Sequence, residues 1–134
     1  MTTDDSGPRF VERPCVMYVG GKDPWIVVND GIYRSAIDEA IACFPGGLIT
    51  IEEGYRTDLA SVPRLPWIYA GFGDRAVNAS ILHDWLYSNR LGTRTLADRL
   101  FLEAMGAERD PRQIWKQHLM YLAVRLFGQL YWDT

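Results

Sequence analysis

The chain has 134 residues, of which 48% are hydrophobic and 13% aromatic, and its formal net charge at neutral pH is −3. This length corresponds to one domain that buries about two thirds of its unfolded surface in a single core. The acidic balance argues against nucleic acid as the main partner.

The N-terminal residues 1–8 are polar and acidic, which predicts a disordered leader and no signal peptide. The longest wholly apolar run, residues 119–124, is far too short to span a bilayer. Cys15 and Cys43 are the only cysteines, and their spacing fits neither a zinc site nor a disulfide framework. A single bridge between them stays open.

Residues 9–56 are expected to be mainly β-structure. Residues 10–19 are rich in β-branched and aromatic side chains, and a Gly- and Pro-containing segment separates them from a second apolar run at residues 25–28. Asn29-Asp30-Gly31 is a hairpin signal, so we expect the following run, residues 32–35, to pair back on the second strand.

The next segments combine a short helix, a strand and an irregular stretch. Residues 35–44 fit a short helix that Ser35 caps and that Pro45-Gly46-Gly47 closes. Residues 48–51 alternate apolar side chains with Thr, as a strand does. Residues 57–73 then predict an ordered loop with a short helix, because the prolines in this stretch restrict the backbone to turns.

The C-terminal region, residues 74–134, is expected to be helical. Apolar side chains recur with helical periodicity on both halves of residues 76–105, which predicts two antiparallel helices joined by a short turn near residues 88–94. Asp110-Pro111 then starts a long helix that runs to about residue 130. The predicted fold class is therefore α+β: one domain, residues 9–134, with a small N-terminal antiparallel β-layer packed on a C-terminal bundle of about three main helices.

The two antiparallel helices bring together residues that carry chemistry. A histidine beside an apolar stripe is more often a packing residue than a catalyst, but His83 on the first helix lies within reach of Asp98 on the second. A carboxylate that holds one imidazole nitrogen leaves the other to act as a general base. Asp84 projects from another side of the helix and is a candidate metal ligand. Tyr87 is a candidate to orient either carboxylate, or a core residue.

The segment Tyr69-Ala70-Gly71-Phe72-Gly73 is a candidate calcium loop, since its glycines allow the backbone carbonyls to turn inward. With Asp84 as the one carboxylate, such a site would bind calcium weakly. The alternative is that Gly71 and Gly73 only end one helix and admit the next. Asp58 is a candidate buried acceptor of loop amides, with an orienting or metal-binding role as the alternative.

Two family resemblances are carried by these residues. The segments Thr57-Asp58-Leu59-Ala60-Ser61-Val62-Pro63-Arg64, His83-Asp84-Trp85-Leu86-Tyr87, Ala97-Asp98 and Ala123-Val124-Arg125-Leu126-Phe127-Gly128 resemble a family of small proteins of unknown function from tailed phages and prophages. That resemblance implies a phage origin near tail or late genes. It also implies synthesis in the host cytoplasm, with the virion as a further location and phage structural proteins as candidate partners.

The second resemblance is to the secreted-type phospholipase A2 superfamily. There a Tyr-x-Gly-x-Gly calcium loop precedes a helix with His-Asp-x-x-Tyr, and a second helix carries the Asp that orients the His. The matching residues here are Tyr69, Gly71, Gly73, His83, Asp84, Tyr87 and Asp98. The resemblance implies that His83 activates a water, Asp98 orients the imidazole, and calcium held by Asp84 and the loop polarises an ester carbonyl of phospholipid.

Two functions follow from the sequence. One is a calcium-assisted ester hydrolase of the phospholipase type that acts on the host envelope. The other is a non-catalytic phage particle, tail-module or assembly protein in which the His83–Asp98 pair is a buried structural contact.

Overall fold

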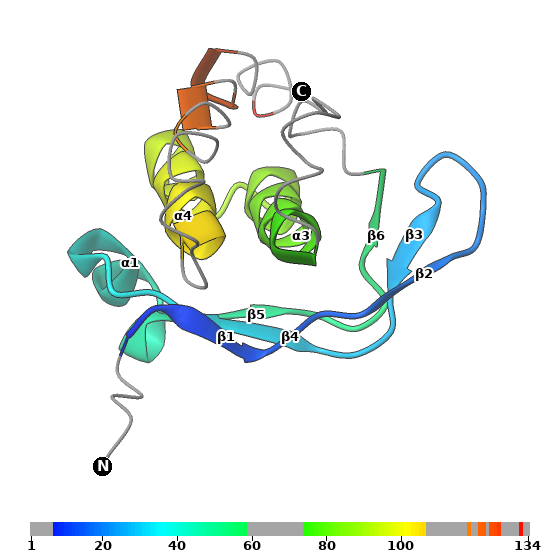
Figure 1. The fold of residues 1–134 in the computed structure, drawn as a ribbon, viewed down its shortest axis with the longest axis horizontal. Helices are drawn as coiled ribbons and strands as arrows, with labels where there is room; N and C mark the ends of the chain where they lie inside the picture. Colours follow the sequence, from blue (N-terminus) through cyan, green and yellow to red (C-terminus); the bar gives the residue numbers. More distant parts are fainter. Residues whose placement is uncertain are drawn as a thin grey trace.

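The computed structural model describes residues 7–58 and 74–106 and seven residues of the C-terminal region: His118, Tyr121, Leu122, Val124, Arg125, Leu126 and Trp132. The described part is α+β, with the strands in the N-terminal half and the long helices after them (Figure 1). The predicted helix over residues 110–130 lies outside the described residues except at these C-terminal positions, where His118, Tyr121, Leu122 and residues 124–126 are helical.

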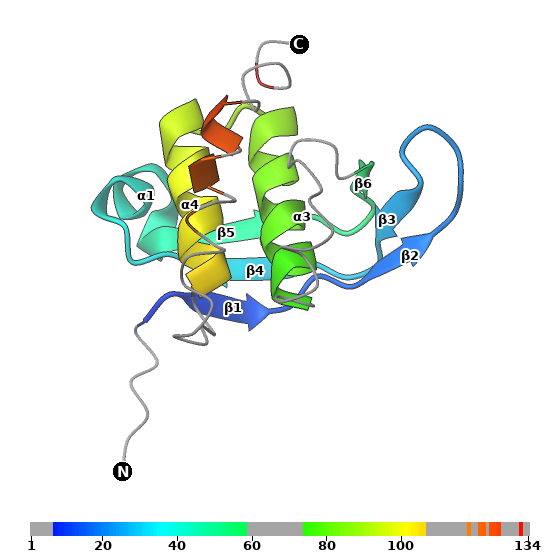
Figure 2. The same cartoon turned by 45° about the horizontal axis from the view of Figure 1, so that its top comes forward.

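The long helices lie over one face of the first sheet (Figures 1 and 2). Its strands are antiparallel in the order β1 (Arg9–Glu12), β4 (Gly31–Arg34) and β5 (Leu48–Ile51). Alternate side chains of β4 and β5 point to opposite faces, and Tyr33 pairs with Ile49 on the face that the helices cover. Both side chains are buried, as is Ile51. This face forms the floor of the hydrophobic core.

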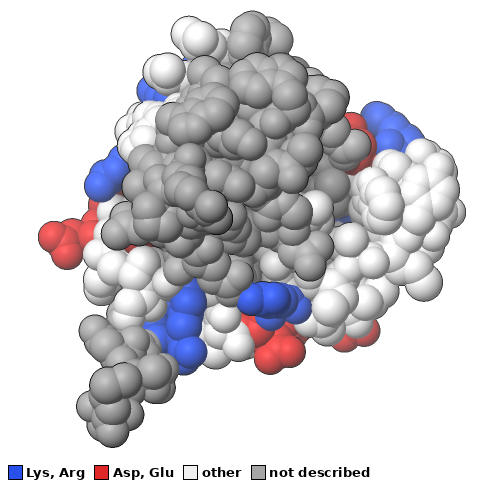
Figure 3. Space-filling model, in the orientation of Figure 1, with Lys and Arg blue, Asp and Glu red and all other residues white. Residues whose placement is uncertain are grey.

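The second sheet extends from one end of the first, as Figures 1 and 2 show. Its antiparallel order is β2 (Val16–Tyr18), β3 (Trp25–Val27) and β6 (Arg56–Thr57). β2 is an edge strand with Met17 and Tyr18 exposed. In the space-filling view, the described surface at this end of the molecule consists largely of uncharged residues (Figure 3).

Two predictions about strand pairing are wrong. β4 pairs with β1 and β5 rather than with β3, because the chain crosses between the sheets at residues 28–30. The Asn29 side chain holds this crossing: its Oδ1 accepts a hydrogen bond from Cys15 N, and its Nδ2 donates to Arg13 O, both at 2.9 Å. Residues 10–19 likewise form two strands in different sheets, with Pro14 between them.

The strand β6 lies at the boundary between the expected β-region, which ends at residue 56, and the expected loop, which begins at residue 57. It is only two residues long, and its residues Arg56 and Thr57 pair with β3. Its short length conceals the period-two pattern that marks a strand.

The short helix α1 (Asp38–Cys43) is present, but Ser35 does not cap it. The N-cap residue is Ile37, and the Ser35 hydroxyl accepts a hydrogen bond from Ile37 N at 3.0 Å instead. The 3₁₀ turn η1 (Pro45–Gly47) closes the segment as predicted. Gly47 has φ of 73°, and a Cβ there would lie 2.7 Å from the Ser35 carbonyl oxygen, so only glycine fits.

The predicted helical hairpin is present as α3 (Asp74–Ser88) and α4 (Arg94–Gly106), which lie side by side over the first sheet (Figures 1 and 2). In the turn between them, Gly92 has a positive φ of 70°, and the Thr93 hydroxyl accepts a hydrogen bond from Leu96 N as the N-cap of α4. The facing side chains that fill the core between the helices and the sheet are fully buried: Ile81, Leu82, Leu86, Leu100 and Phe101. None of the helices in the described part is long and apolar enough to cross a membrane.

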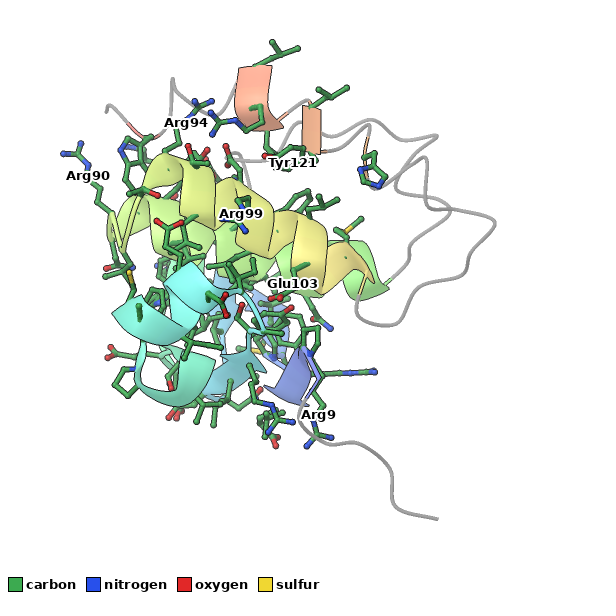
Figure 4. All side chains as sticks on the ribbon, turned by 90° about the vertical axis from the view of Figure 1, so that its left-hand side faces the viewer. Arg9, Arg90, Arg94, Arg99, Glu103 and Tyr121 are labelled. Atoms are coloured by element: carbon green, nitrogen blue, oxygen red, sulfur yellow. The ribbon has the colours of Figure 1, made fainter. Side chains whose placement is uncertain are left out.

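Glu103 joins α4 to the sheet and to the start of α1. Its Oε1 accepts a hydrogen bond from the Tyr33 hydroxyl at 2.9 Å, and its Oε2 accepts one from Ala36 N at 3.0 Å. Burial, and then the Glu103 carboxylate, raise the pKa of Tyr33 above its usual range, so the phenol stays protonated as the donor. Figure 4 shows Glu103 between α4 and α1. This contact fixes how the helical hairpin sits on the sheet.

Candidate functional site

The centre of the candidate site is a buried His–Asp pair at the contact between α3 and α4. His83 Nε2 lies 2.7 Å from Asp98 Oδ1, and both side chains have no exposed surface. The pair forms because antiparallel neighbouring helices bring a polar residue of one apolar stripe against a polar residue of the other. The structure therefore brings together the two residues that the sequence proposed as catalytic.

The Asp98 carboxylate has two further donors. The Tyr87 hydroxyl, one turn of α3 after His83, donates to Oδ1 at 2.5 Å. Arg125 Nη1 donates to Oδ2 at 2.9 Å. The two oxygens together thus accept hydrogen bonds from three side chains, and one of them is a cation. Such a carboxylate is held in one orientation by its donors.

The environment of His83 sets its protonation state. Burial lowers the pKa of the imidazole, and this effect outweighs the nearby Asp98, which acts in the opposite direction. The aromatic rings of Tyr87 and Phe101 lie against it, with ring centroids at 4.1 and 5.2 Å. A neutral imidazole that faces a carboxylate with Nε2 carries its proton there. Nδ1 is then the unprotonated, basic nitrogen.

Asp84, the next residue along α3, belongs to a different network. One residue of helix is about a hundred degrees of rotation, so its side chain points away from Asp98 and toward the segment around β6. Asp84 Oδ2 accepts hydrogen bonds from the Tyr55 hydroxyl, at 2.6 Å, and from the Thr57 hydroxyl. The Tyr55 ring packs edge-on against Trp85, with centroids 4.9 Å apart. Burial, and then Asp84, raise the pKa of Tyr55, so its hydroxyl remains a donor.

Both hydroxyl donors meet the same oxygen of Asp84. Among the described residues, no hydrogen bond reaches Asp84 Oδ1, and the side chain keeps 7% of its surface exposed. Tyr55 and Thr57 therefore orient the Asp84 carboxylate through Oδ2, and none of the described residues donates to Oδ1. Within the described ranges, no three His, Cys, Asp or Glu side chains gather in a metal-binding group, so acidic side chains there supply this one carboxylate only.

The remaining predicted site residues are placed differently. Tyr69, Gly71 and Gly73 of the candidate calcium loop lie outside the described residues. Asp58 is exposed, so the expectation that it is buried is wrong. The reason is the alternation of the short strand β6: Thr57 takes the inward position, and the residue after it points outward.

Three residues of the site were missed by reasoning from the sequence. Tyr55 and Thr57 flank Arg56 in a segment that reads as irregular, and their spacing of two was the only signal that both hydroxyls lie on one face. Arg125 lies 27 residues after Asp98, so no local pattern links the two. The motif of residues 123–128 drew attention to the segment that contains Arg125, but it did not indicate that Arg125 contacts Asp98.

Comparison with known proteins identifies one family, and the function of that family is unknown. No curated protein and no solved structure gave a significant match to the chain. The family model described as "Protein of unknown function (DUF1353)" matches residues 25–124. The matched region includes both members of the His83–Asp98 pair, their partner Tyr87, and both hydroxyl donors to Asp84, but it stops just before Arg125. Because more than half of the chain is matched, the protein belongs to the DUF1353 family.

Proposed function

We propose that the protein is an ester hydrolase of the phospholipase A2 type in which His83 is the general base and Asp98 orients it. The single observation that carries the proposal is the contact of His83 Nε2 with a carboxylate that Tyr87 and Arg125 also hold. This arrangement fixes the imidazole in one tautomer and supports a basic Nδ1, which is what general-base catalysis requires.

The proposed reaction is the hydrolysis of an acyl ester. His83 Nδ1 accepts a proton from a water molecule while the water oxygen forms a bond to the ester carbonyl carbon. The C–O bond to the alcohol then breaks, and the imidazolium returns the proton to the departing oxygen, so that a carboxylic acid and an alcohol leave. Asp98 stabilises the transient imidazolium through Nε2 without taking its proton.

Asp84 is the proposed ligand for calcium, which when bound would polarise the ester carbonyl. The orientation of its carboxylate by Tyr55 and Thr57, with Oδ1 left over, fits a ligand role. A hard cation needs six or more oxygens, so the carbonyls of residues 69–73 would have to supply most of the shell. A site with one carboxylate would hold calcium weakly, with a dissociation constant on the order of 10⁻⁴ to 10⁻³ M.

The proposed substrate is phospholipid of a bacterial envelope, and the proposed origin of the chain is a tailed phage. Both rest on the resemblances of the His83-Asp84-Trp85-Leu86-Tyr87 and Ala123–Gly128 segments. A weak calcium site suits this setting, because it stays empty at cytosolic calcium and fills outside the cell. The enzyme would be silent during synthesis in the host and active on release.

The second candidate is a non-catalytic phage particle or assembly protein, and the complete burial of His83 and Asp98 favours it. In that case the pair holds α3 against α4, and phage structural proteins would be the partners. Buried hydrogen-bonded His–carboxylate pairs serve structure as well as catalysis, so activity has to be separated from stability by experiment.

The separating experiment is the substitution His83→Gln, with the release of fatty acid from phospholipid vesicles and the thermal melt measured on the same preparations. Glutamine keeps a donor for Asp98 but has no basic nitrogen. A catalytic His83 predicts that hydrolysis in calcium is lost while most of the stability remains.

His118→Gln is the matched control, since His118 is the other histidine of the chain and is exposed. It should leave both hydrolysis and the melt unchanged. A wild-type chain that releases no fatty acid with or without calcium, together with a loss of about 1–3 kcal/mol in His83→Gln, would rule out the hydrolase and leave the structural candidate.

A further inference from the structure

Two arginines connect the C-terminal segment, whose described residues here are 124–126, to the His83–Asp98 site. One arginine lies in the segment and contacts α4, and the other lies on α4 and contacts the segment. Arg125, in the C-terminal segment, donates from Nη1 to Asp98 on α4 at 2.9 Å. Arg94, on the first turn of α4, donates from Nη2 to the main-chain carbonyls of Val124, at 3.3 Å, and Arg125. Each element therefore supplies a guanidinium to the other.

The geometry on α4 explains how the two contacts act together. Arg94 and Asp98 are four residues apart, so they lie one above the other on the same face of the helix. Figure 4 shows Arg94 near the C-terminal helical segment, with Arg99 further along α4. Val124 is fully buried in the core, and the Trp132 ring packs edge-on against Tyr87 with centroids 5.2 Å apart. The C-terminal segment thus contacts the site at several points.

The Arg125 contact fixes the plane of the Asp98 carboxylate relative to His83. The terminal torsion of an aspartate has a broad, two-fold preference, so nothing within the residue fixes its plane. Two donors on Oδ1, from His83 and Tyr87, leave Oδ2 as a buried acceptor that needs a partner. Arg125 supplies it and is itself one third exposed, with 32% of its side chain open to solvent.

We propose that Arg125 is a positioning residue of the site, and that the site is complete only when the C-terminal segment is seated on α4 by Arg125 and Arg94. Arg125 locks the Asp98 carboxylate so that Oδ1 accepts a hydrogen bond from Nε2–H of His83, which holds the imidazole in the tautomer with a basic Nδ1. The catalytic consequence rests on the proposed function, whereas the tautomer does not.

The test reads the tautomer directly. In a ¹⁵N-labelled chain at neutral pH, a protonated and an unprotonated ring nitrogen give separate signals, and His118→Gln assigns the His83 pair because there are two histidines. The wild type should show one protonated nitrogen, Nε2, and one unprotonated nitrogen, Nδ1. Arg125→Gln should draw the two signals toward each other, because the carboxylate then samples more than one orientation. Arg125→Lys keeps a cationic donor and should restore the wild-type pattern.

Arg99→Gln is the matched control: it removes an arginine from the residue next to Asp98, and among the described residues Arg99 pairs with the exposed Glu39 at 3.5 Å. It should leave the His83 signals unchanged. Unchanged signals in folded Arg125→Gln would overturn the proposal. If that variant does not fold, Arg94→Gln takes its place, since it releases the carbonyls of residues 124 and 125, and a wild-type pattern there would overturn the proposal equally.

Hydrolysis is measured on the same variants, so that the hydrolase proposal and the positioning role of Arg125 are tested independently of each other. If the wild type is active, Arg125→Gln should lower kcat roughly ten-fold with little change in KM, the size of a general-base term that is partly lost. If the wild type is inactive, the hydrolase proposal fails, and the ring-nitrogen signals still decide the role of Arg125.

Discussion

The substitution Asp98→Asn tests whether the Asp98 carboxylate is the structural hub of the helical pair. It keeps the shape of the side chain and removes its charge. The amide oxygen can still accept from His83 and Tyr87, but the NH₂ group then faces Arg125, which is also a donor. Turning the amide over satisfies Arg125, but His83 and Tyr87 then face an NH₂ group and would have to give up their roles as donors. Neither orientation satisfies all three partners.

The expected loss follows from these contacts. A hydrogen bond to a charged group contributes about 1.5–3 kcal/mol, and breaking a buried ion pair by removing one partner costs about 3–5 kcal/mol. Arg125 is one third exposed and regains water, which places the loss toward the lower end. We expect the free energy of unfolding to fall by about 3 kcal/mol, which lowers the melting temperature of a chain of this length by roughly 10 °C.

Urea unfolding followed by tryptophan fluorescence measures this loss, because the chain has five tryptophans. Glu39→Gln is the matched change of carboxylate to amide, at an exposed ion pair with Arg99, and it should cost less than about 0.5 kcal/mol. If Asp98→Asn lost under about 1 kcal/mol, close to the control, the carboxylate would not be the hub and the reasoning built on its three donors would fail.

Three further predictions concern the same helices. Tyr87→Phe should lower the free energy of unfolding by about 1–2 kcal/mol in the same urea assay, since it removes one donor to a buried carboxylate and leaves the ring in place. A loss as large as that of Asp98→Asn would contradict this. Stability should decrease as pH falls below the ordinary histidine pKa of 6.5, because burial lowers the pKa of His83 in the folded state and the unfolded chain then binds more protons. The urea midpoint of His83→Gln should therefore fall less than that of the wild type between pH 7 and pH 5, and equal slopes would contradict the cause. Calcium at about ten millimolar should raise the melting temperature of the wild type and not that of Asp84→Asn; no rise in either would exclude the calcium site.

The helical part of the fold was accessible from the sequence because its signals are local. The apolar periodicity on both sides of Gly92, and the short connection, were enough to predict α3 and α4 as antiparallel neighbours. The pairing of His83 with Asp98 follows from that geometry. Asp84 was correctly expected to point elsewhere, because a helix turns by about a hundred degrees per residue.

The arrangement of the strands was not accessible, because side chains distant in sequence decide it. Asn29-Asp30-Gly31 has the composition of a hairpin turn, yet Asn29 bonds to the backbone of residues 13 and 15 and becomes the crossing between two sheets. The hydroxyl donors to Asp84 were missed for a similar reason. β6 is only two residues long and is identified by its pairing with β3, so the spacing of two between Tyr55 and Thr57 was too short a pattern to predict a strand.

The adjacency of His83 and Asp84 has a consequence for the register of α3. His83 is held by Asp98 on one side of the helix, and Asp84 is held by Tyr55 and Thr57 on another. If α3 turned about its axis by one residue, each side chain would leave its partner, and a histidine and a carboxylate would both be buried unpaired. An interface of apolar side chains alone would tolerate such a rotation of α3, because apolar side chains of similar volume can replace one another in the core. The two polar networks, on different sides of α3, therefore allow the helix only one orientation about its own axis.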